Sequence, residues 1–142
     1  MSKHQEGERL MANQELIQKA IEVRDRAYVP YSNFGVGAAL LTKSGKVYTG
    51  CNIENAAYPV SLCAERVAIF KAISEGETEF VELAVVADTE RPVPPCGSCR
   101  QVMSEFFDSE MNVHLTNLNS NTMTVKMEEL LPFSFQKTDM EK

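Results

Sequence analysis

The apolar residues of the first segment recur at the period of a helix. Five of them fall on one face of residues 13–27, and these are Leu16, Ile17, Ala20, Ile21 and Ala27. This spacing predicts an amphipathic helix that Asn13 caps. Residues 1–12 are polar and are expected to form a disordered or weakly ordered N-terminal extension, and residues 136–142 a polar tail. The pattern between them predicts a single domain over residues 13–135.

Five short apolar runs predict strands. Residues 36–41 and 46–52 are separated by the short turn KSGK, so they are expected to pair as an antiparallel hairpin. Residues 81–88 form a continuous apolar run, which is typical of a central strand. Residues 112–117 and 123–127 are joined by a polar turn that is too short for a parallel crossover, so this pair is also expected to be antiparallel.

Two helices are predicted between these strands. Residues 63–76 end at a glycine and are apolar nearly all round from Val67 to Ile73, which predicts heavy burial. The second helix covers residues 96–107, and four of its side chains are expected to point inward: Val102, Met103, Phe106 and Phe107. Residues 128–135 close the domain with a short helix and an aromatic end.

Two strand–helix–strand crossovers imply an α/β fold. We predict a three-layer structure with a mixed five-stranded sheet and helices on both faces. The first and last strand pairs are antiparallel in this prediction, and the central crossovers are parallel.

The composition is that of a soluble globular protein. The chain has 142 residues, of which 44% are hydrophobic and 24% charged, enough for one domain with a substantial core. It has no apolar run of membrane-spanning length, and its first residues lack the apolar region of a secretion signal, so a cytoplasmic location is expected. The net charge is -6 and the basic residues are scattered. This argues against a nucleic-acid partner and favours a small molecule or a protein.

The stretch PPCGSCRQ carries Cys96 and Cys99 at a spacing that suits either a zinc site or a thiol–disulfide exchanger. Cys63 and Cys96 each begin a predicted helix. In such a sheet the helix starts lie at the carboxyl ends of strands and can converge. The positive ends of the helix dipoles would favour the thiolates that a metal requires. Three cysteines leave a tetrahedral zinc with one open position, the arrangement of a catalytic site.

Glu65 follows Cys63 by two residues, at a helix start where both side chains can address one site. A carboxylate beside an open zinc position can act as general base for a bound water. Three plainer interpretations stay open at this point. The cysteines can be a redox pair with a buried Cys63, or Cys51 can complete a four-cysteine structural site, although we expect Cys51 to be a packing residue. Glu65 can also be an ordinary first-turn glutamate.

The segment CAE at residues 63–65, followed by PCGSCRQ, resembles the zinc-dependent cytidine deaminases in their three-cysteine form. The segment YVPYSNFGVGAALLTKSGKVYTGCNIENAAYP is similar to the nucleoside-binding half of that family, and EELLPFSF to its closing segment. The resemblance covers residues 13–135.

This resemblance implies one Zn²⁺ per chain, bound by Cys63, Cys96 and Cys99, with Glu65 as the proton shuttle. Zinc with three thiolates has a net charge of about -1, which makes a bound water a poorer acid. Arg66 and Gln101 are therefore expected to donate hydrogen bonds to the thiolates and so reduce the negative charge on the sulfur atoms.

The resemblance also implies the substrate contacts. Phe34 would line the base pocket, Ala64 would contact the substrate, and Asn52 and Glu54 would bind the ribose 3′-hydroxyl. Three residues would act between subunits of a homotetramer with shared pockets: Ala56 and Tyr58 toward the 5′-hydroxyl, and Phe135 to close a pocket.

The implied reaction is hydrolytic deamination of cytidine and 2′-deoxycytidine to uridine and 2′-deoxyuridine, with release of ammonia, in pyrimidine salvage. Zinc-bound hydroxide would attack C4. Two alternatives are a deaminase of another aminated heterocycle on the same fold and a non-catalytic module that zinc stabilises.

Overall fold

The computed structural model describes residues 2–141, except for the side chains of residues 8–12. One sheet holds five strands, which are β1 (Val36–Thr42), β2 (Val47–Cys51), β3 (Phe80–Ala87), β4 (Asn112–Asn117) and β5 (Thr122–Lys126). The α-helices are α1 (Lys3–Arg24), α2 (Ala64–Ser74), α3 (Gly97–Phe106) and α4 (Met127–Leu130). Two 3-10 turns cover Tyr58–Val60 and Lys137–Met140. Among the described residues, no helix is long and apolar enough to span a membrane.

The strand order is β2-β1-β3-β4-β5. The predicted hairpins β1–β2 and β4–β5 are antiparallel, and β3–β4 is parallel. β1 lies between β2 and β3 and is antiparallel to both, so α2 connects two strands that run in the same direction. The predicted mixed sheet is therefore confirmed.

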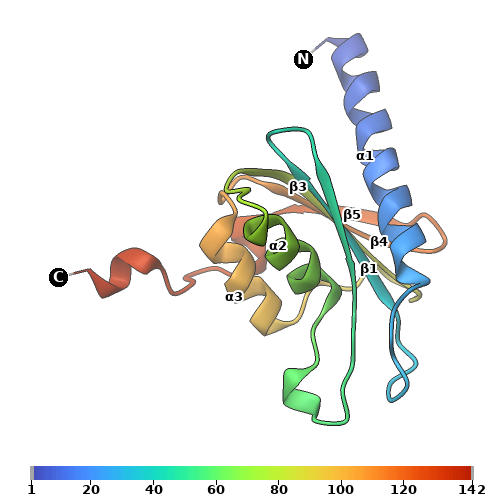
Figure 1. Cartoon of the computed structure of the whole chain (residues 1–142). Coiled ribbons are helices and arrows are strands. Elements are labelled where there is room, and N and C mark those ends of the chain that lie inside the picture. The colour runs from blue at the N-terminus through green and yellow to red at the C-terminus, as the bar shows by residue number, and fades with distance from the viewer. Residues whose placement is uncertain (1, 142) are drawn as a thin grey trace.

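Helices cover both faces of the sheet (Figure 1). On one face, Leu16 and Ala20 of α1 pack against Ala39, Ala84 and Val86. The opposite face carries α2 and α3 over the larger core. This core places the starts of α2 and α3 beside each other, which is the part of the fold that builds the site.

The first helix is longer at its start than the sequence pattern predicts. α1 begins at Lys3, where Ser2 and Gln5 form a capping box, so the predicted start with Asn13 as cap is wrong. The helix ends at Arg24 rather than at residue 27. Apolar periodicity marks only the turns that pack on the sheet, and the first turns of α1 project beyond it (Figure 1). Polar side chains that favour helices need no apolar face to form those turns.

Two burial predictions are wrong in part. Phe106 is 40% exposed, whereas Phe107 is 6% exposed and packs edge-on against Phe80 with ring centroids 5.6 Å apart. Phe107 follows the buried Met103 by one helical turn, while Phe106 is rotated toward solvent. Phe70 is likewise exposed, because α2 lies in an outer layer and buries only the face that contacts the sheet.

A glycine allows α2 to approach the sheet closely. A Cβ added at Gly50 of β2 would lie 2.5 Å from the Ala64 carbonyl oxygen and 2.6 Å from the Ala68 amide nitrogen. Gly37 has the same role under α1, where a Cβ would lie 2.9 Å from the Arg24 amide nitrogen. Because Ala64 directly follows Cys63, Gly50 helps to set the position of the site.

Candidate metal centre and active site

Three cysteines from two helix starts converge. Cys63 is the N-cap of α2, Cys96 is the N-cap of α3, and Cys99 lies in the first turn of α3. The sulfur of Cys96 is 3.7 Å from that of Cys63 and 3.5 Å from that of Cys99, and all three lie within 4.8 Å of one another. α2 follows β2 and α3 follows β3, so the parallel direction of these two strands brings both helix starts to one end of the sheet.

This cluster fits a zinc ion. Zinc–thiolate bonds of about 2.3 Å in tetrahedral geometry require sulfur–sulfur separations of about 3.8 Å, close to those observed. The three cysteines are free thiols, and the cluster does not include Cys51, which is buried at the end of β2. With three sulfur ligands, one tetrahedral position stays open for a small molecule.

The surroundings favour negative charge on the sulfur of Cys63, whereas the hydrogen bond that it shares with Cys99 raises the pKa of Cys99. A hydrogen bond from Cys99 and the neighbouring Arg66 lower the pKa of Cys63 to about 5. Arg66 Nη2 donates to Cys63 Sγ over 3.5 Å, as the expected role of Arg66 requires. Arg66 Nε is buried and has no hydrogen-bond partner among the described residues. A guanidinium in this position offsets part of the charge that three thiolates bring.

Glu65 is the buried acid of the site. It is only 4% exposed, and burial raises its pKa to about 7. A carboxyl with such a pKa can both accept and donate a proton near neutral pH. Glu65 also lines a cavity together with Cys63 and Cys96, so it is not an ordinary exposed first-turn glutamate.

The cavity has a volume of about 280 Å³. It brings Cys63, Cys96 and Glu65 together with three of the expected substrate residues, which are Phe34, Asn52 and Ala64. The other walls are apolar: Val36, Val85, Ala87, Val93, Pro94 and Pro95. A largely apolar cavity with a few polar groups at one end is typical of a small-molecule site. Sequence reasoning missed these walls, because an apolar residue at a strand end has the same pattern whether it faces the core or a ligand.

A second, more open hollow of about 420 Å³ holds Glu54 and Tyr58, with Tyr31, Ser32 and Ser61. Glu54 accepts hydrogen bonds from the amides of Tyr31 (3.0 Å) and Ser32 (3.1 Å) and from the Ser32 hydroxyl (2.5 Å). The Ser32 hydroxyl is the main reason that the pKa of Glu54 is lowered. Sequence reasoning missed Ser32, which only its place in the loop before Phe34 could have suggested.

Asn52 joins the Phe34 loop to the strands. Its Oδ1 accepts from the Val36 amide over 2.8 Å, and its Nδ2 donates to the Phe34 carbonyl over 2.7 Å. The carboxamide therefore fixes the backbone on either side of Gly35, beside the cavity.

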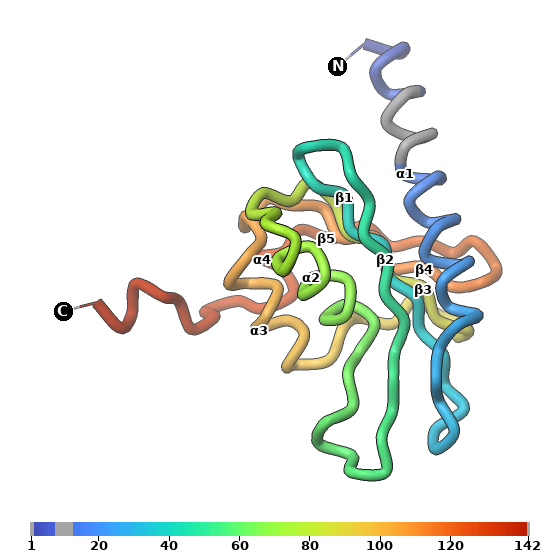
Figure 2. The backbone as a smooth tube through the Cα atoms, viewed as in Figure 1, coloured from blue at the N-terminus to red at the C-terminus, as the bar shows by residue number. Residues whose placement is uncertain are grey.

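Three expected residues lie away from the cavity within one chain. Ala56 is exposed, Tyr58 is 70% exposed, and Phe135 is 60% exposed on the C-terminal segment that leads away from the body of the molecule (Figure 2). Gln101 donates to the Phe135 carbonyl over 3.0 Å. Its amide thus holds this segment beside α3, and no hydrogen bond from Gln101 to a thiolate is found among the described residues.

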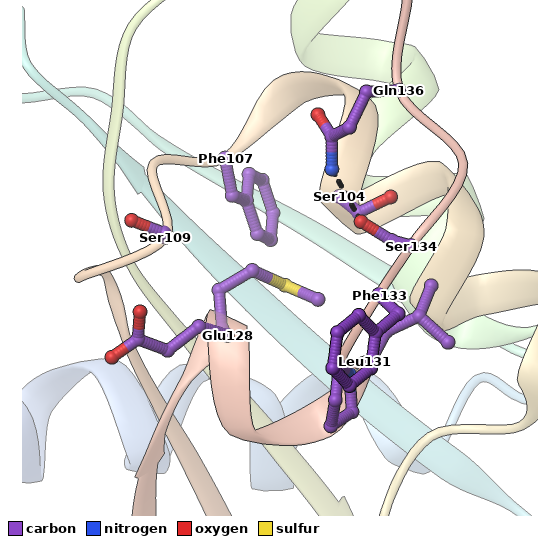
Figure 3. A pocket seen from close by; sticks show the side chains of 10 residues that line it. Ser104, Phe107, Ser109, Glu128, Leu131, Phe133, Ser134 and Gln136 are labelled. Atoms are coloured by element: carbon purple, nitrogen blue, oxygen red, sulfur yellow. Dashed lines mark hydrogen bonds between the residues drawn. The ribbon is translucent and has the colours of Figure 1, made fainter. Parts of the chain in front are cut away.

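A further hollow of about 340 Å³ lies between α3, α4 and residues 131–136 (Figure 3). Phe107, Glu128, Leu131 and Phe133 are among its lining residues. None of its lining residues is a cysteine, and it shares no lining residue with the cavity at the cysteine cluster.

Comparison with known proteins agrees with this geometry. Residues 11–115 match the family profile described as "Cytidine and deoxycytidylate deaminase zinc-binding region". A cytidine deaminase of Halalkalibacterium halodurans is 55% identical over 130 residues, which are 92% of this chain and 98% of that protein. One of Sporosarcina psychrophila is 54% identical and covers 89% of this chain and 93% of its own length.

Solved structures have the same fold. The crystal structure of a cytidine deaminase from Burkholderia pseudomallei superposes with a TM-score of 0.83 at 44% identity, over 95% of this chain and all of that one. A cytidine deaminase from Mycobacterium tuberculosis superposes with a TM-score of 0.75 at 38% identity, over 86% of this chain and 95% of its own. Because the profile, the relatives, the fold and the three-cysteine zinc site agree, the chain belongs to the zinc-dependent cytidine deaminase family of enzymes.

Proposed function

We propose that this enzyme hydrolyses cytidine and 2′-deoxycytidine to uridine and 2′-deoxyuridine and releases ammonia, as a step of pyrimidine salvage in the cytoplasm. The observation that carries the proposal is the buried carboxyl of Glu65, which lines a cavity of about 280 Å³ together with Cys63 and Cys96. The names of its relatives supply the substrate class.

The cavity suits the base, and Asn52 in its wall together with Glu54 in the second hollow suits the sugar. Phe34 offers an aromatic face to a pyrimidine ring, and the chain around Ala64 contacts the base close to the cysteines. Asn52 and Glu54 supply polar groups for the 3′-hydroxyl, which ribose and deoxyribose share. Both sugars are therefore accepted in this proposal.

Cys63, Cys96 and Cys99 would hold the zinc ion. A zinc ion bound there would supply Lewis acidity, which lowers the pKa of a water molecule. Arg66 donates to Cys63 and so reduces the negative charge of the cluster, which would otherwise weaken this effect.

Glu65 moves both protons of the attacking water. Its carboxylate accepts the first proton as the water oxygen bonds to C4, and delivers it to ring N3. It then accepts the second proton from the new C4 hydroxyl and delivers it to the amino group. The C4–N bond breaks with its electron pair on nitrogen, and ammonia leaves. One carboxyl can serve every transfer because its pKa lies near neutral pH.

Neighbouring chains complete the site in a homotetramer in this proposal. The exposed Tyr58 and Ala56 would reach toward the 5′-hydroxyl of a nucleoside in an adjacent subunit. Phe135, on its extended segment, would close another pocket (Figure 2). The exposure of Tyr58 and Phe135 in the single chain supports this assignment.

Glu65→Gln tests the proposal, since it keeps the shape of the side chain but removes the proton carrier. We expect cytidine turnover to fall by at least ~10²–10⁴-fold, the usual worth of general acid–base catalysis. The loss of cytidine absorbance would be followed in the ultraviolet, with zinc measured in the same samples. Zinc content should stay near one ion per chain in both proteins.

Two outcomes would contradict the proposal. A fully metallated wild type that leaves cytidine and 2′-deoxycytidine unchanged would redirect the search to other aminated heterocycles. Equal turnover by Glu65→Gln would remove Glu65 from the mechanism. If no heterocycle reacted, the chain would be a module in which zinc only stabilises the fold.

A further inference from the structure

The Ser32 hydroxyl lies between a backbone amide and a carboxylate. It accepts a hydrogen bond from the Phe34 amide over 3.0 Å and donates to Glu54 Oε2 over 2.5 Å. The Ser32 amide donates to the other oxygen, Oε1, over 3.1 Å. Because the Phe34 amide can only donate, it directs the Ser32 proton toward Glu54.

The loop that carries Ser32 is held firmly enough for this role. Asn33 has a left-handed backbone with φ 56°, and its amide donates to the Val29 carbonyl over 3.0 Å. Asn52 holds the Phe34 carbonyl, and Glu54 donates its own amide to the Tyr28 carbonyl over 2.8 Å. Separate backbone contacts therefore fix Ser32 and Glu54, and the Ser32 hydroxyl links the two residues by a hydrogen bond.

These bonds leave Glu54 able to accept one more. Oε1 already receives two amides, from Tyr31 and Ser32, whereas Oε2 receives the Ser32 hydroxyl. A carboxylate oxygen has room for two donors, so Oε2 can take a further one. Three donors also hold the pKa of Glu54 below its usual range, so the group is a charged acceptor at neutral pH.

We infer that Ser32 is a positioning residue, whose hydroxyl holds the Glu54 carboxylate so that Oε2 meets the 3′-hydroxyl of the bound nucleoside. This inference rests on the proposed function, which assigns the base of a nucleoside to the cavity and its sugar to Glu54, in the hollow that Ser32 also lines. Ser32 itself touches neither the base nor the reacting atoms in this assignment.

The test compares nucleosides with and without the 3′-hydroxyl. Ser32→Ala should lower kcat/KM for cytidine by about fivefold or more, through KM, because a hydrogen bond to a charged group is lost. The same variant should change kcat/KM for 2′,3′-dideoxycytidine by less than about twofold, since that substrate lacks the group that Glu54 binds. Ser32→Thr keeps the hydroxyl and should restore cytidine kinetics.

Ser74→Ala is the matched control. Its hydroxyl donates to the Lys71 carbonyl at the far end of α2, so both substrates should react as with wild type. Melting midpoints of all variants would be compared, to exclude a general loss of folding. A loss by Ser32→Ala that is equal for both nucleosides, or no loss with cytidine, would overturn the inference.

Binding of uridine and 2′,3′-dideoxyuridine, measured by calorimetry on zinc-loaded protein, gives a readout that needs no turnover. Wild type should bind uridine more tightly than the dideoxy form, and Ser32→Ala should reduce that difference. If wild type fails to deaminate cytidine, the proposed reaction fails, and the calorimetric pair still decides the role of Ser32. Equal binding of the two nucleosides by wild type would overturn the inference.

Discussion

At the scale of single residues, the surroundings separate the four cysteines into two kinds. Cys51 is 9% exposed at the end of β2 and lies outside the cluster. Cys63 lies at the start of α2, with Arg66 and Cys96 beside its sulfur. The low pKa of Cys63 follows first from its hydrogen bond with Cys99 and then from Arg66 and Cys96. Cys51 lies outside this cluster.

This contrast predicts opposite effects of two similar substitutions. Cys63→Ala should reduce bound zinc from about one ion per chain to near none, because two thiolates hold zinc far less tightly than three. Cys51→Ala should keep its zinc and cost only about 1 kcal/mol of stability. Metal analysis after passage over a chelating resin checks both. Loss of zinc from Cys51→Ala would revive the four-cysteine structural site.

At the scale of elements, the packing of α2 on β2 couples the fold to the site. Gly50 lies under the first turn of α2, which carries Glu65 directly after Cys63 and Ala64. A side chain there would meet backbone atoms rather than a movable side chain. The helix would have to shift, and the site would shift with it.

Gly50→Ala should therefore destabilise the protein by about 1–3 kcal/mol and weaken its hold on zinc. Gly97→Ala is the matched control at the start of α3, because a Cβ there meets nothing within 4 Å. Denaturant unfolding gives the stability, and competition with a chromogenic chelator gives the zinc affinity. If both variants held zinc as tightly as wild type, the close approach at Gly50 would not set the position of the site.

Some of the elements could be predicted from the sequence pattern, and others could not. The two hairpins were predictable because a short turn leaves no choice but antiparallel pairing. The start of α1 was not predictable from the sequence pattern, because helical turns that project from the sheet need no apolar face. Phe106 and Phe107 are neighbours of the same type, and tertiary contacts such as that of Phe107 with Phe80 decide which is buried.

At the scale of the whole molecule, one chain leaves large apolar side chains in solvent. Tyr58 and Phe135 are 70% and 60% exposed, and Phe133 is fully exposed with a left-handed backbone at φ 57°. Single exposed apolar side chains are common on proteins, but a contiguous patch of them often marks an interaction site. In the proposed homotetramer, other copies of the chain would cover these side chains, and Tyr58 would reach a neighbouring site.

The proposed homotetramer predicts a particle of about four times the chain mass of 15.8 kDa. Tyr58→Asp should lower both the assembled fraction and the activity, because burying a carboxylate at an interface is costly. Its zinc content should stay unchanged, since Tyr58 is not part of the cysteine cluster. Light scattering after size exclusion gives the mass, and a monomer with full activity at assay concentration would contradict the tetramer.

The sequence by itself was enough to predict the cysteines of the zinc site, the acid beside them and the pairing of the hairpins. Two local pairs made this possible: Cys96 and Cys99 are one helical turn apart, and Glu65 is in the first turn after Cys63. Local geometry limits such neighbours to few arrangements, so their spacing already carries the chemistry. The meeting of Cys63 with Cys96, 33 residues along the chain, depends on the fold.

Only the tertiary structure decided what surrounds those groups. The apolar wall of Val85, Ala87 and Val93, the link from Ser32 to Glu54 and the burial of Glu65 all depend on contacts between segments far apart in the chain. Burial is a property of these long-range contacts, and it is burial that raises the pKa of Glu65 to about 7. The same glutamate on an exposed helix start would be an ordinary charged residue.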